Sequence, residues 1–381
     1  MKKLLPIIFL LFFLSCKEEK KQQLPLINET ENVAIDYAKG FSIEKPSDDI
    51  TVITINSPWP NAESSYTYAL IPKDKQAFIS LDASAYDAII ATPVERIIVT
   101  STTHIPALEA LGVSDKLVGF PNTDFISSEA TRKLISNGQV QDLGSNEAIN
   151  TEMVIALQPE VVIGFGIDNK NSAYNTIQRA NIPIVYNGDW TEESPLGKSE
   201  WIKFFAPFFG MEATADTIFN TIETSYQEAK ELAKKATSKP TVLSGGLYKD
   251  VWYLPGGNSW MAQFFKDAQA DYLWKETQET GSLSLSWESV FSKAEKADFW
   301  ISPSMHTSYT SMAEASLHYQ QFDAFKNKKI HSYTLATGST GGLLFFELGP
   351  SRPDIVLKDF IHIFHPALLP DYSPTFFKPL Q

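Results

Sequence analysis

"TEMVIALQPEVVIGFG", residues 151–166, combines the three signals that decide the fold. Its first half has the composition of a short helix, Pro159 marks a turn, and the apolar run that begins at Val161 ends in glycines, as a buried strand does. The stretch "SWESVFSKAEKADFWISPS", residues 286–304, has the same plan: a glutamate near a helix start, alanine-rich turns and then a buried strand. The chain therefore contains one helix-and-strand unit twice.

Strands and helices alternate on both sides of these two units. From residue 93 to about residue 200, apolar runs such as "RIIVTST" and "IPIVYNGDW" alternate with helical segments, and the alternation begins again at "TVLSGG". Strands that alternate with helices form parallel sheets covered on both faces. The predicted fold class is therefore α/β, with two Rossmann-like lobes, residues 93–200 and 239–381, each built on a parallel central sheet.

One long α-helix is predicted to join the lobes, within residues 201–238. Its clearest part runs from Glu212 to Lys235, where apolar residues form one stripe, acidic residues come early and lysines come late, as the helix dipole prefers. Roughly 24 residues at 1.5 Å each would span about 36 Å. Before the first lobe, residues 30–92 alternate apolar and polar side chains, which predicts an N-terminal β ribbon of short antiparallel strands.

The first residues, "MKKLLPIIFLLFFLSC", have a basic start, an apolar run and a small residue before cysteine. This pattern predicts a signal peptide over residues 1–15. The sequence "FLSC" resembles the lipobox of bacterial lipoproteins, which implies that Cys16 becomes the lipidated N-terminus. The charged segment 16–29 would then be a tether to the membrane. Because Cys16 is the only cysteine, a disulfide framework and a cysteine-based zinc site are excluded.

Composition and motifs argue against several other classes of protein. The formal net charge of −13 disfavours nucleic acid as a partner. The segment "GSTGG", residues 338–342, lacks the Lys-Ser/Thr of a phosphate loop, and neither HExxH nor GxSxG occurs. We therefore expect no catalytic residues, no resident cofactor and no metal site.

The chain resembles the substrate-binding lipoproteins of ABC importers, the family that captures iron–siderophore complexes, haem or cobalamin. The resemblance covers about residues 94–372 and is carried by the segments "RIIVTSTTHIPALEALGVSDKLVG", "NTEMVIALQPEVVIG", "IPIVYNGDWTEESPLGKSEWIKFF", "WYLPGGNSWMAQFFKDAQADYLW" and "GGLLFFELGPSRPDIVLKDFIHIFHP". It implies two lobes joined by one long helix, with the ligand in the cleft between them.

The resemblance also implies that a surface glutamate on each lobe docks on arginines of the permease. These positions correspond to Glu152 and Glu288, in the helix before a buried strand of each lobe. Their neighbours Glu147 and Glu295 are hard to distinguish from them on sequence alone. The alternative for each is an ordinary solvated charge.

Ligands of open parallel sheets bind beyond the carboxyl ends of the strands, and this rule predicts the residues of the cleft. Aromatic rings and a fixed cation among them would suit a bulky, partly apolar, anionic chelate. The candidates are Thr102, Thr103, His104, Phe165, Tyr186, Asp189, Trp190, Tyr248, Trp252, Ser302, Ser304, Phe345 and Arg352.

Structural alternatives remain open for several of these residues. Trp190 and Trp252 would serve equally as core aromatics. Arg352 could cap a helix or pair with Asp354, and His104 at a helix start is more often a structural residue than a metal ligand. His362 and His365, three apart on the last helix, fit a packing helix better than a metal site.

The sequence thus predicts an exported, monomeric receptor, anchored by lipid to a bacterial membrane and facing the periplasm. It would bind an iron chelate or a corrinoid and deliver it to an ABC permease. A zinc or manganese receptor, an exported hydrolase or chelatase on the same shell, and an adhesive surface lipoprotein remain alternatives. They would require, respectively, converging metal ligands, a nucleophile with a base, or a broad apolar patch.

Overall fold

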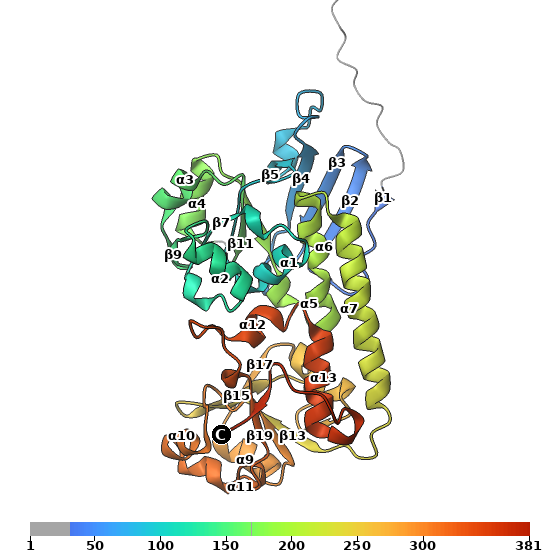
Figure 1. Ribbon diagram of the computed structural model, residues 1–381, viewed down its shortest axis with the longest axis vertical. Helices are drawn as coiled ribbons and strands as arrows, with labels where there is room; N and C mark the ends of the chain where they lie inside the picture. The colour runs from blue at the N-terminus through green and yellow to red at the C-terminus, as the bar shows by residue number, and fades with distance from the viewer. Residues whose placement is uncertain (1–30, 169) are drawn as a thin grey trace, which may run out of the picture.

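The computed structural model describes residues 31–168 and 170–381, and the signal peptide, Cys16 and the tether lie outside these residues. Two lobes are stacked along the long axis of the molecule, and one long helix runs beside both (Figure 1). The predicted α/β class, with a parallel sheet in each lobe and a long helix between them, is confirmed.

The N-terminal residues form a five-stranded sheet in the order β1-β2-β3-β4-β5. Its strands are β1 (Glu31–Asn32), β2 (Phe41–Ser47), β3 (Ile50–Ile55), β4 (Tyr66–Pro72) and β5 (Ala88–Thr92). The first four strands pair antiparallel, as expected, but β5 pairs parallel with β4. The expectation of a purely antiparallel ribbon is wrong at this pair, because the chain between β4 and β5 returns to the start of β4 before β5 begins.

The N-terminal lobe has a parallel sheet in the order β12-β11-β6-β7-β8. Its strands are β6 (Ile97–Val99), β7 (Leu117–Phe120), β8 (Gln141–Asp142), β11 (Val161–Phe165) and β12 (Ile184–Asn187). Its helices are α1 (Ile105–Ala110), α2 (Glu129–Ser136), α3 (Thr151–Leu157) and α4 (Ser172–Arg179). A small hairpin joins β9 (Gly144–Ser145) to β10 (Ala148–Ile149).

The C-terminal lobe has a sheet in the order β16-β13-β18-β19-β20, parallel except for the final pair. Its strands are β13 (Thr241–Ser244), β16 (Asp271–Tyr272), β18 (Phe299–Ile301), β19 (Ile330–Ser332) and β20 (Lys378–Pro379). An antiparallel sheet beside it contains β14 (Gly246–Tyr248), β15 (Val251–Pro255) and β17 (Ser282–Leu285). The helices are α8 (Trp260–Asp267), α9 (Trp287–Ala294), α10 (Tyr309–Ala315), α11 (Asp323–Lys326), α12 (Leu344–Leu348) and α13 (Pro353–Phe364).

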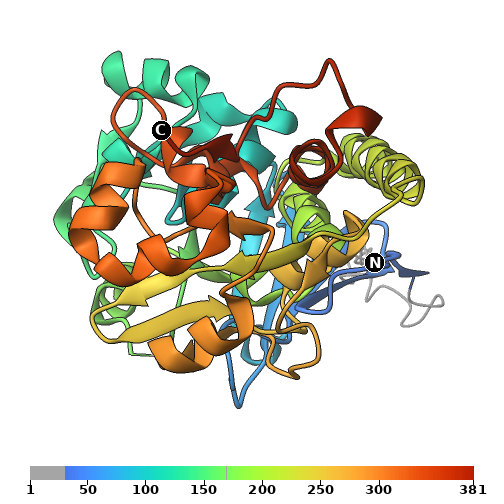
Figure 2. The ribbon, with the colours of Figure 1, turned by 90° about the horizontal axis from the view of Figure 1, so that it is seen from below.

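The connecting helix α7 (Glu212–Ala233) has 22 residues, which corresponds to about 33 Å at 1.5 Å per residue. Its first half packs Phe219 into the core of the N-terminal lobe, and its second half packs Tyr226 into the core of the C-terminal lobe. Helix α13 lies beside it, as the view along the two helices in Figure 2 shows. The shorter helices α5 (Pro195–Glu200) and α6 (Ile202–Phe205) lead into α7. Among the helices described, none is both long and apolar enough to cross a membrane.

Buried carboxylates fasten the N-terminal sheet to its lobe. The Glu200 side chain, which is fully buried, accepts hydrogen bonds from the backbone N–H groups of Asp36, Tyr37 and Ala38. Glu192 likewise accepts from the N–H of Gly40 at 2.7 Å. Hydrogen bonds to charged groups typically contribute about 1.5–3 kcal/mol. The sheet is therefore a fixed part of the N-terminal lobe, and it can supply residues to a site.

Candidate functional site

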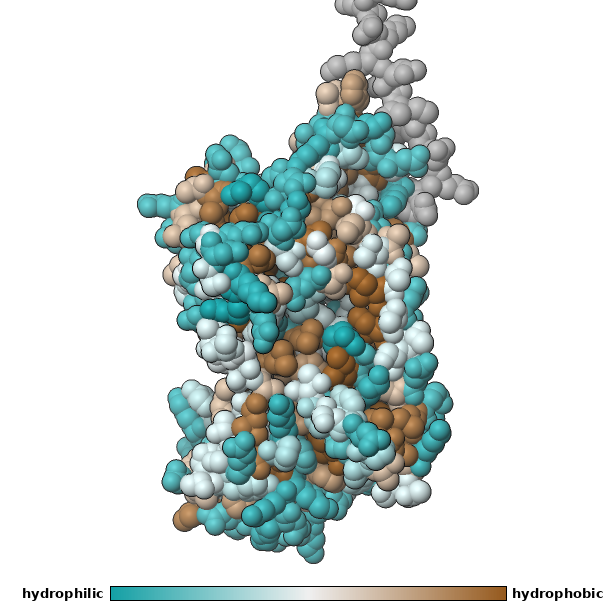
Figure 3. Space-filling model, viewed as in Figure 1, coloured by the Kyte–Doolittle hydropathy of each residue, from teal (hydrophilic) through white to brown (hydrophobic). Residues whose placement is uncertain are grey.

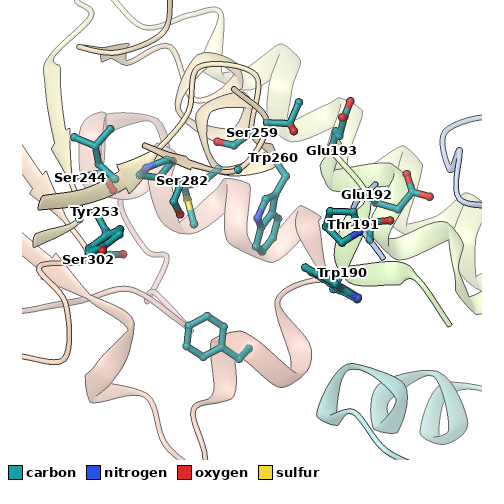
Figure 4. Close-up of a pocket in the computed structure, with 18 of the residues that line it drawn as sticks. Trp190, Thr191, Glu192, Glu193, Ser244, Tyr253, Ser259, Trp260, Ser282 and Ser302 are labelled. Atoms are coloured by element: carbon teal, nitrogen blue, oxygen red, sulfur yellow. The ribbon is translucent and has the colours of Figure 1, made fainter. Parts of the chain in front are cut away.

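A cavity of about 910 Å³, the main cleft, lies between the lobes. Figure 4 shows side chains of both lobes around one space: Trp190, Thr191 and Glu193 come from the N-terminal lobe and Ser244, Tyr253, Ser282 and Ser302 from the C-terminal lobe. The loop after β3 adds Trp59. The main cleft therefore lies beyond the carboxyl ends of the central strands, where the rule for parallel sheets predicts it.

Stacked aromatic rings form one wall of the main cleft. Trp260, the first residue of α8, stacks on Phe345 at 5.6 Å between ring centroids, and Phe345 stacks on Tyr333 at 5.5 Å. Across the space, Trp190 packs against Phe165 at 5.6 Å. Such faces suit a ligand with a flat, partly apolar surface.

A second compartment of about 480 Å³ adjoins the main cleft, and Phe346 lines both. Its walls come from the loops that follow β6, β7 and β11 in the N-terminal lobe and from loops of the C-terminal lobe. Two large apolar side chains at this compartment are exposed: Phe125 by 61% and Met305 by 62%. The two spaces together form an interlobe cleft.

Unpaired neutral polar atoms add hydrogen-bonding capacity to the cleft. Within the described residues, three buried polar atoms of its lining side chains have no hydrogen-bond partner: Ser302 Oγ, Asn146 Oδ1 and Trp190 Nε1. Ser302 has a left-handed backbone, with φ at +57°, which turns the chain sharply after β18. Because an unpaired buried polar atom is costly, a bound molecule that satisfies these atoms is stabilised.

A third cavity, the α7 cavity, has a volume of about 590 Å³ and is lined by α1, α6, α7 and the segment from Leu348 to Asp354. Apolar side chains gather in the hollow between the lobes beside α7 (Figure 3). Charged groups also line it: Arg352 and Lys198 have partners, whereas Asp189 Oδ1 is buried without a hydrogen-bond partner among the described residues. Arg352 Nε and Nη2 each donate to the Asp354 carboxylate at 2.9 Å. Lys198 Nζ donates to the backbone oxygens of Asp189 and Trp190 at 3.1 and 3.0 Å, and burial lowers the pKa of Lys198 to about 8.

A family model described as periplasmic binding protein matches residues 97–334, more than half of the 381 residues. The chain belongs to the periplasmic binding protein family. Because this family and the similar solved structures are solute-binding proteins, the expectation that the chain is not an enzyme is confirmed.

Individual relatives agree with this assignment. An uncharacterized lipoprotein of Methanocaldococcus jannaschii is 25% identical over 298 residues, which cover 76% of this chain and 69% of the relative. An ABC transporter substrate-binding lipoprotein of Bacillus subtilis is 23% identical over 237 residues, 58% of this chain and 72% of the relative. A periplasmic haem-binding protein of Pseudomonas aeruginosa has the same fold, with a TM-score of 0.59, 16% identity, and coverage of 76% and 98% of the two chains.

Seven of the thirteen predicted ligand-binding residues line the interlobe cleft of this periplasmic binding protein. They are Trp190, Tyr248, Ser302, Ser304 and Phe345 in the main cleft and Thr102 and Phe165 in the second compartment. Three others, Thr103, Asp189 and Arg352, line the α7 cavity instead. Arg352 is paired with Asp354, which was the structural alternative to a role in ligand binding.

His104, Tyr186 and Trp252 line neither part of the cleft. Trp252 is fully buried, stacks on Trp300 at 5.3 Å, and donates its indole N–H to the Ser244 backbone oxygen at 3.0 Å. His104 is fully buried and burial lowers its pKa to about 4, so the ring is neutral at pH 7. Tyr186 packs against Trp59 at 5.2 Å between ring centroids, within an aromatic core cluster.

The sequence interpretation missed Tyr253, Trp260, Trp59, Tyr333 and Glu193, all of which line the main cleft. A signal existed for Trp260, because "PGGNSW" places it after a strand and at a helix start, capped by Ser259. Glu193 follows directly after the predicted Trp190 loop. Trp59 belongs to the N-terminal ribbon, to which no binding residue was assigned.

Glu152 and Glu288 occupy equivalent places on the two lobes. Each is the second residue of its helix, and the residue before each helix is a cap: Asn150 accepts from the N–H of Met153, and Ser286 accepts from the N–H of Ser289. Both glutamates are exposed and neither lines the interlobe cleft or the α7 cavity. Glu147, by contrast, lines the second compartment, and Glu295 follows the end of α9.

Proposed function

We propose that this protein is the substrate-binding lipoprotein of an ABC importer and that it captures an iron chelate, haem or a corrinoid in the interlobe cleft. The observation that carries the proposal is the main cleft of about 910 Å³, lined by both lobes of a periplasmic binding protein. Ligand sites of small molecules usually measure about 300–1,000 Å³. The Bacillus relative is named an ABC transporter substrate-binding lipoprotein and the Pseudomonas structure a haem-binding protein, which supports both parts of the proposal.

The aromatic walls favour a large ligand over a bare ion. The stacked rings of Trp260, Phe345 and Tyr333 line the cavity with apolar surface. Within residues 31–168 and 170–381, no three His, Cys, Asp or Glu side chains are placed to hold a metal ion. The zinc or manganese alternative therefore gains no support.

The test is to identify what the protein binds. The full chain is purified from its native membranes, and the molecules that co-purify are identified by mass spectrometry and metal analysis. We expect a metal complex in a ratio near one to one, lost in a variant with Tyr253→Ala and Trp260→Ala. Recovery of a sugar, a peptide or a free divalent ion at the same ratio would contradict the proposal.

We extend this proposal to docking: Glu152 and Glu288 bind basic residues of the permease. The support is their equivalent placement, one on each lobe, exposed and away from the cavities. Reversal of both to Arg would place like charges at the interface, which costs several kcal/mol. Uptake should be lost, while ligand affinity and melting temperature stay unchanged.

A matched control carries Glu228→Arg and Glu314→Arg, two other exposed glutamates, and should transport normally. The readout is uptake in cells together with stimulation of the transporter ATPase. If the Glu152 and Glu288 variant transports like the control, docking through these residues is wrong.

We also propose that Cys16 carries the lipid that holds the protein at the membrane, facing the periplasm, as a monomer. Support comes from the sequence "FLSC" and from the naming of two relatives as lipoproteins. Replacing Cys16 with Ala should abolish incorporation of radiolabelled palmitate and release the protein from the membrane fraction. Unchanged labelling of that variant would contradict the assignment.

A further inference from the structure

We infer that the interlobe cleft is selective for charge: it takes neutral or positively charged metal complexes and discriminates against anionic chelates. This inference rests on the proposed function and specifies its ligand class. It also reverses the expectation from sequence, which placed a fixed cation in the cleft.

The first support is the charge of the cleft walls. Of the described residues that line the main cleft and the second compartment, none is Lys, Arg or His, and three are glutamates: Glu147, Glu192 and Glu193. The Glu192 carboxylate is buried, and its oxygens already accept hydrogen bonds from the indole N–H of Trp201 and from backbone N–H groups. Glu147 and Glu193 are exposed and line one compartment each, so they give both compartments a negative charge.

The second support is the position of the nearby cations. Lys198 Nζ lies 5.0 Å from the centroid of the Trp260 ring, but its hydrogen bonds go to backbone oxygens. The carboxylates of Asp189 and Glu192 offset its charge. At the rim, Lys249 Nζ lies 5.5 Å from the centroid of the Tyr248 ring and next to Asp250, and both side chains are exposed to solvent. A ligand anion in the cleft would therefore meet uncompensated carboxylates.

The third support is the chemistry of the unpaired groups. Ser302 Oγ, Asn146 Oδ1 and Trp190 Nε1, unpaired in the described structure, are all neutral. Asn146 Oδ1 accepts hydrogen bonds and would oppose a ligand carboxylate, Trp190 Nε1 only donates, and Ser302 Oγ can do either, so amide groups, which both donate and accept, can satisfy all three. With the aromatic stack, these groups fit a macrocycle or chelate that presents amides and apolar faces.

The test compares metal complexes that differ by one or two carboxylates. Three pairs serve: cyanocobalamin and its monocarboxylate, haem dimethyl ester and haem, and N-acetyl and N-succinyl ferrioxamine B. Titrations of the full chain at pH 7, followed by tryptophan fluorescence, give a Kd for each. In every pair that binds, we expect the carboxylate to bind about tenfold more weakly or worse, and the difference to shrink in 0.5 M salt, because like charges repel and salt screens them.

A variant with Glu147→Gln and Glu193→Gln should lose most of this discrimination. The matched control, Glu228→Gln with Glu314→Gln, has the same change in net charge away from the cleft and should keep it. Equal or tighter binding of the carboxylate members by the native protein would overturn charge selection and leave the proposed function intact. Binding of none of the six probes would contradict the proposed function and, with it, this inference.

Discussion

The interlobe cleft and the α7 cavity lie on the two sides of α12, and they differ in how they handle charge. Phe345 and Phe346 of α12 line the cleft, whereas Leu348, the last residue of the same helix, lines the α7 cavity. The cleft has exposed carboxylates and unpaired neutral groups, while in the α7 cavity the two cations, Lys198 and Arg352, already have partners. A cation near a cavity can therefore bind an anionic ligand only if its charge is not already paired.

The pairing in the α7 cavity has local causes. Arg352 and Asp354 are two residues apart at the start of α13, so the pair forms without help from a distant element. Asp354 lies in the first turn of that helix, where the macrodipole also favours a negative charge. Lys198 in α5 lies over the loop of Asp189 and Trp190 and holds it by two hydrogen bonds. Lys198 therefore stabilises the loop that carries Trp190 into the main cleft.

The largest expected effect is a difference between the variants of two adjacent residues of β15, Trp252 and Tyr253. Trp252→Ala removes a fully buried ring and should lower the free energy of unfolding by about 3–5 kcal/mol. Tyr253→Ala, its neighbour on the cleft side, should leave stability nearly unchanged and weaken ligand binding about five- to 150-fold. Thermal unfolding and titration of the two variants check this. If the two variants change stability and ligand affinity to similar extents, Trp252 and Tyr253 do not differ as a core residue and a cleft residue.

This pair also shows what the sequence could predict and what it could not. Apolar runs between helical segments were sufficient to predict the two parallel sheets, and the apolar stripe of α7 was sufficient to predict the connecting helix. That helix ends at Ala233, two residues before the predicted Lys235. In "VWYLP" of β15, however, both aromatic residues suit either face, and no polar alternation indicates which one turns inward. The packing of β15 on Trp300 decides that Trp252 does.

Long-range placement explains the other differences. The role of Trp59 depends on how the N-terminal sheet sits on its lobe. Glu192 and Glu200 hold it there through backbone N–H groups that lie more than 150 residues away in sequence. The local spacing of Arg352 and Asp354 made their pairing an alternative from the start, but only the structure decides between the pair and a free cation. The main cleft lies at the carboxyl ends of the strands, where a site was expected, because that expectation follows from sheet geometry alone.

The second expected effect concerns the carboxylate that ties α12 to the opposite lobe. Glu347 is 2% exposed and accepts hydrogen bonds from the backbone N–H groups of Ser127 and Ser128, just before α2. Burial, aided by the nearby charge of Glu109, raises the pKa of Glu347 to about 7, against the opposing effect of these hydrogen bonds. Between pH 4.5 and pH 7 the folded protein therefore binds more protons at this site than the unfolded chain. Its contribution to stability is greatest below pH 4.5 and is lost as the pH rises to 7.

Glu347→Gln should flatten the dependence of stability on pH over that window by about 1–3 kcal/mol. Unfolding in urea at pH 5 and at pH 7.5, beside Glu314→Gln as an exposed control, measures the difference. If the native protein and the Gln variant change equally between the two pH values, Glu347 is ionised throughout, and α12 is fixed by a charged contact.

The smallest expected effect tests the division between the two sides of α12 most directly. Arg352 was the cation that the sequence placed against an anionic ligand, but its guanidinium forms two hydrogen bonds to Asp354, on the α7 side. Replacing both partners, Arg352→Met with Asp354→Asn, avoids leaving an unpaired buried carboxylate, which is the costly outcome of removing one partner. The affinity for cyanocobalamin, and for its monocarboxylate, should then change by less than about twofold, which is below 0.5 kcal/mol.

A selective loss of affinity for the monocarboxylate would mean that Arg352 reaches the ligand after the lobes move, and that the cleft does carry the cation expected from sequence. If the variant and the native protein bind each probe with equal affinity, the charge of Arg352 is neutralised by Asp354, as in the structure, and is unavailable to the ligand.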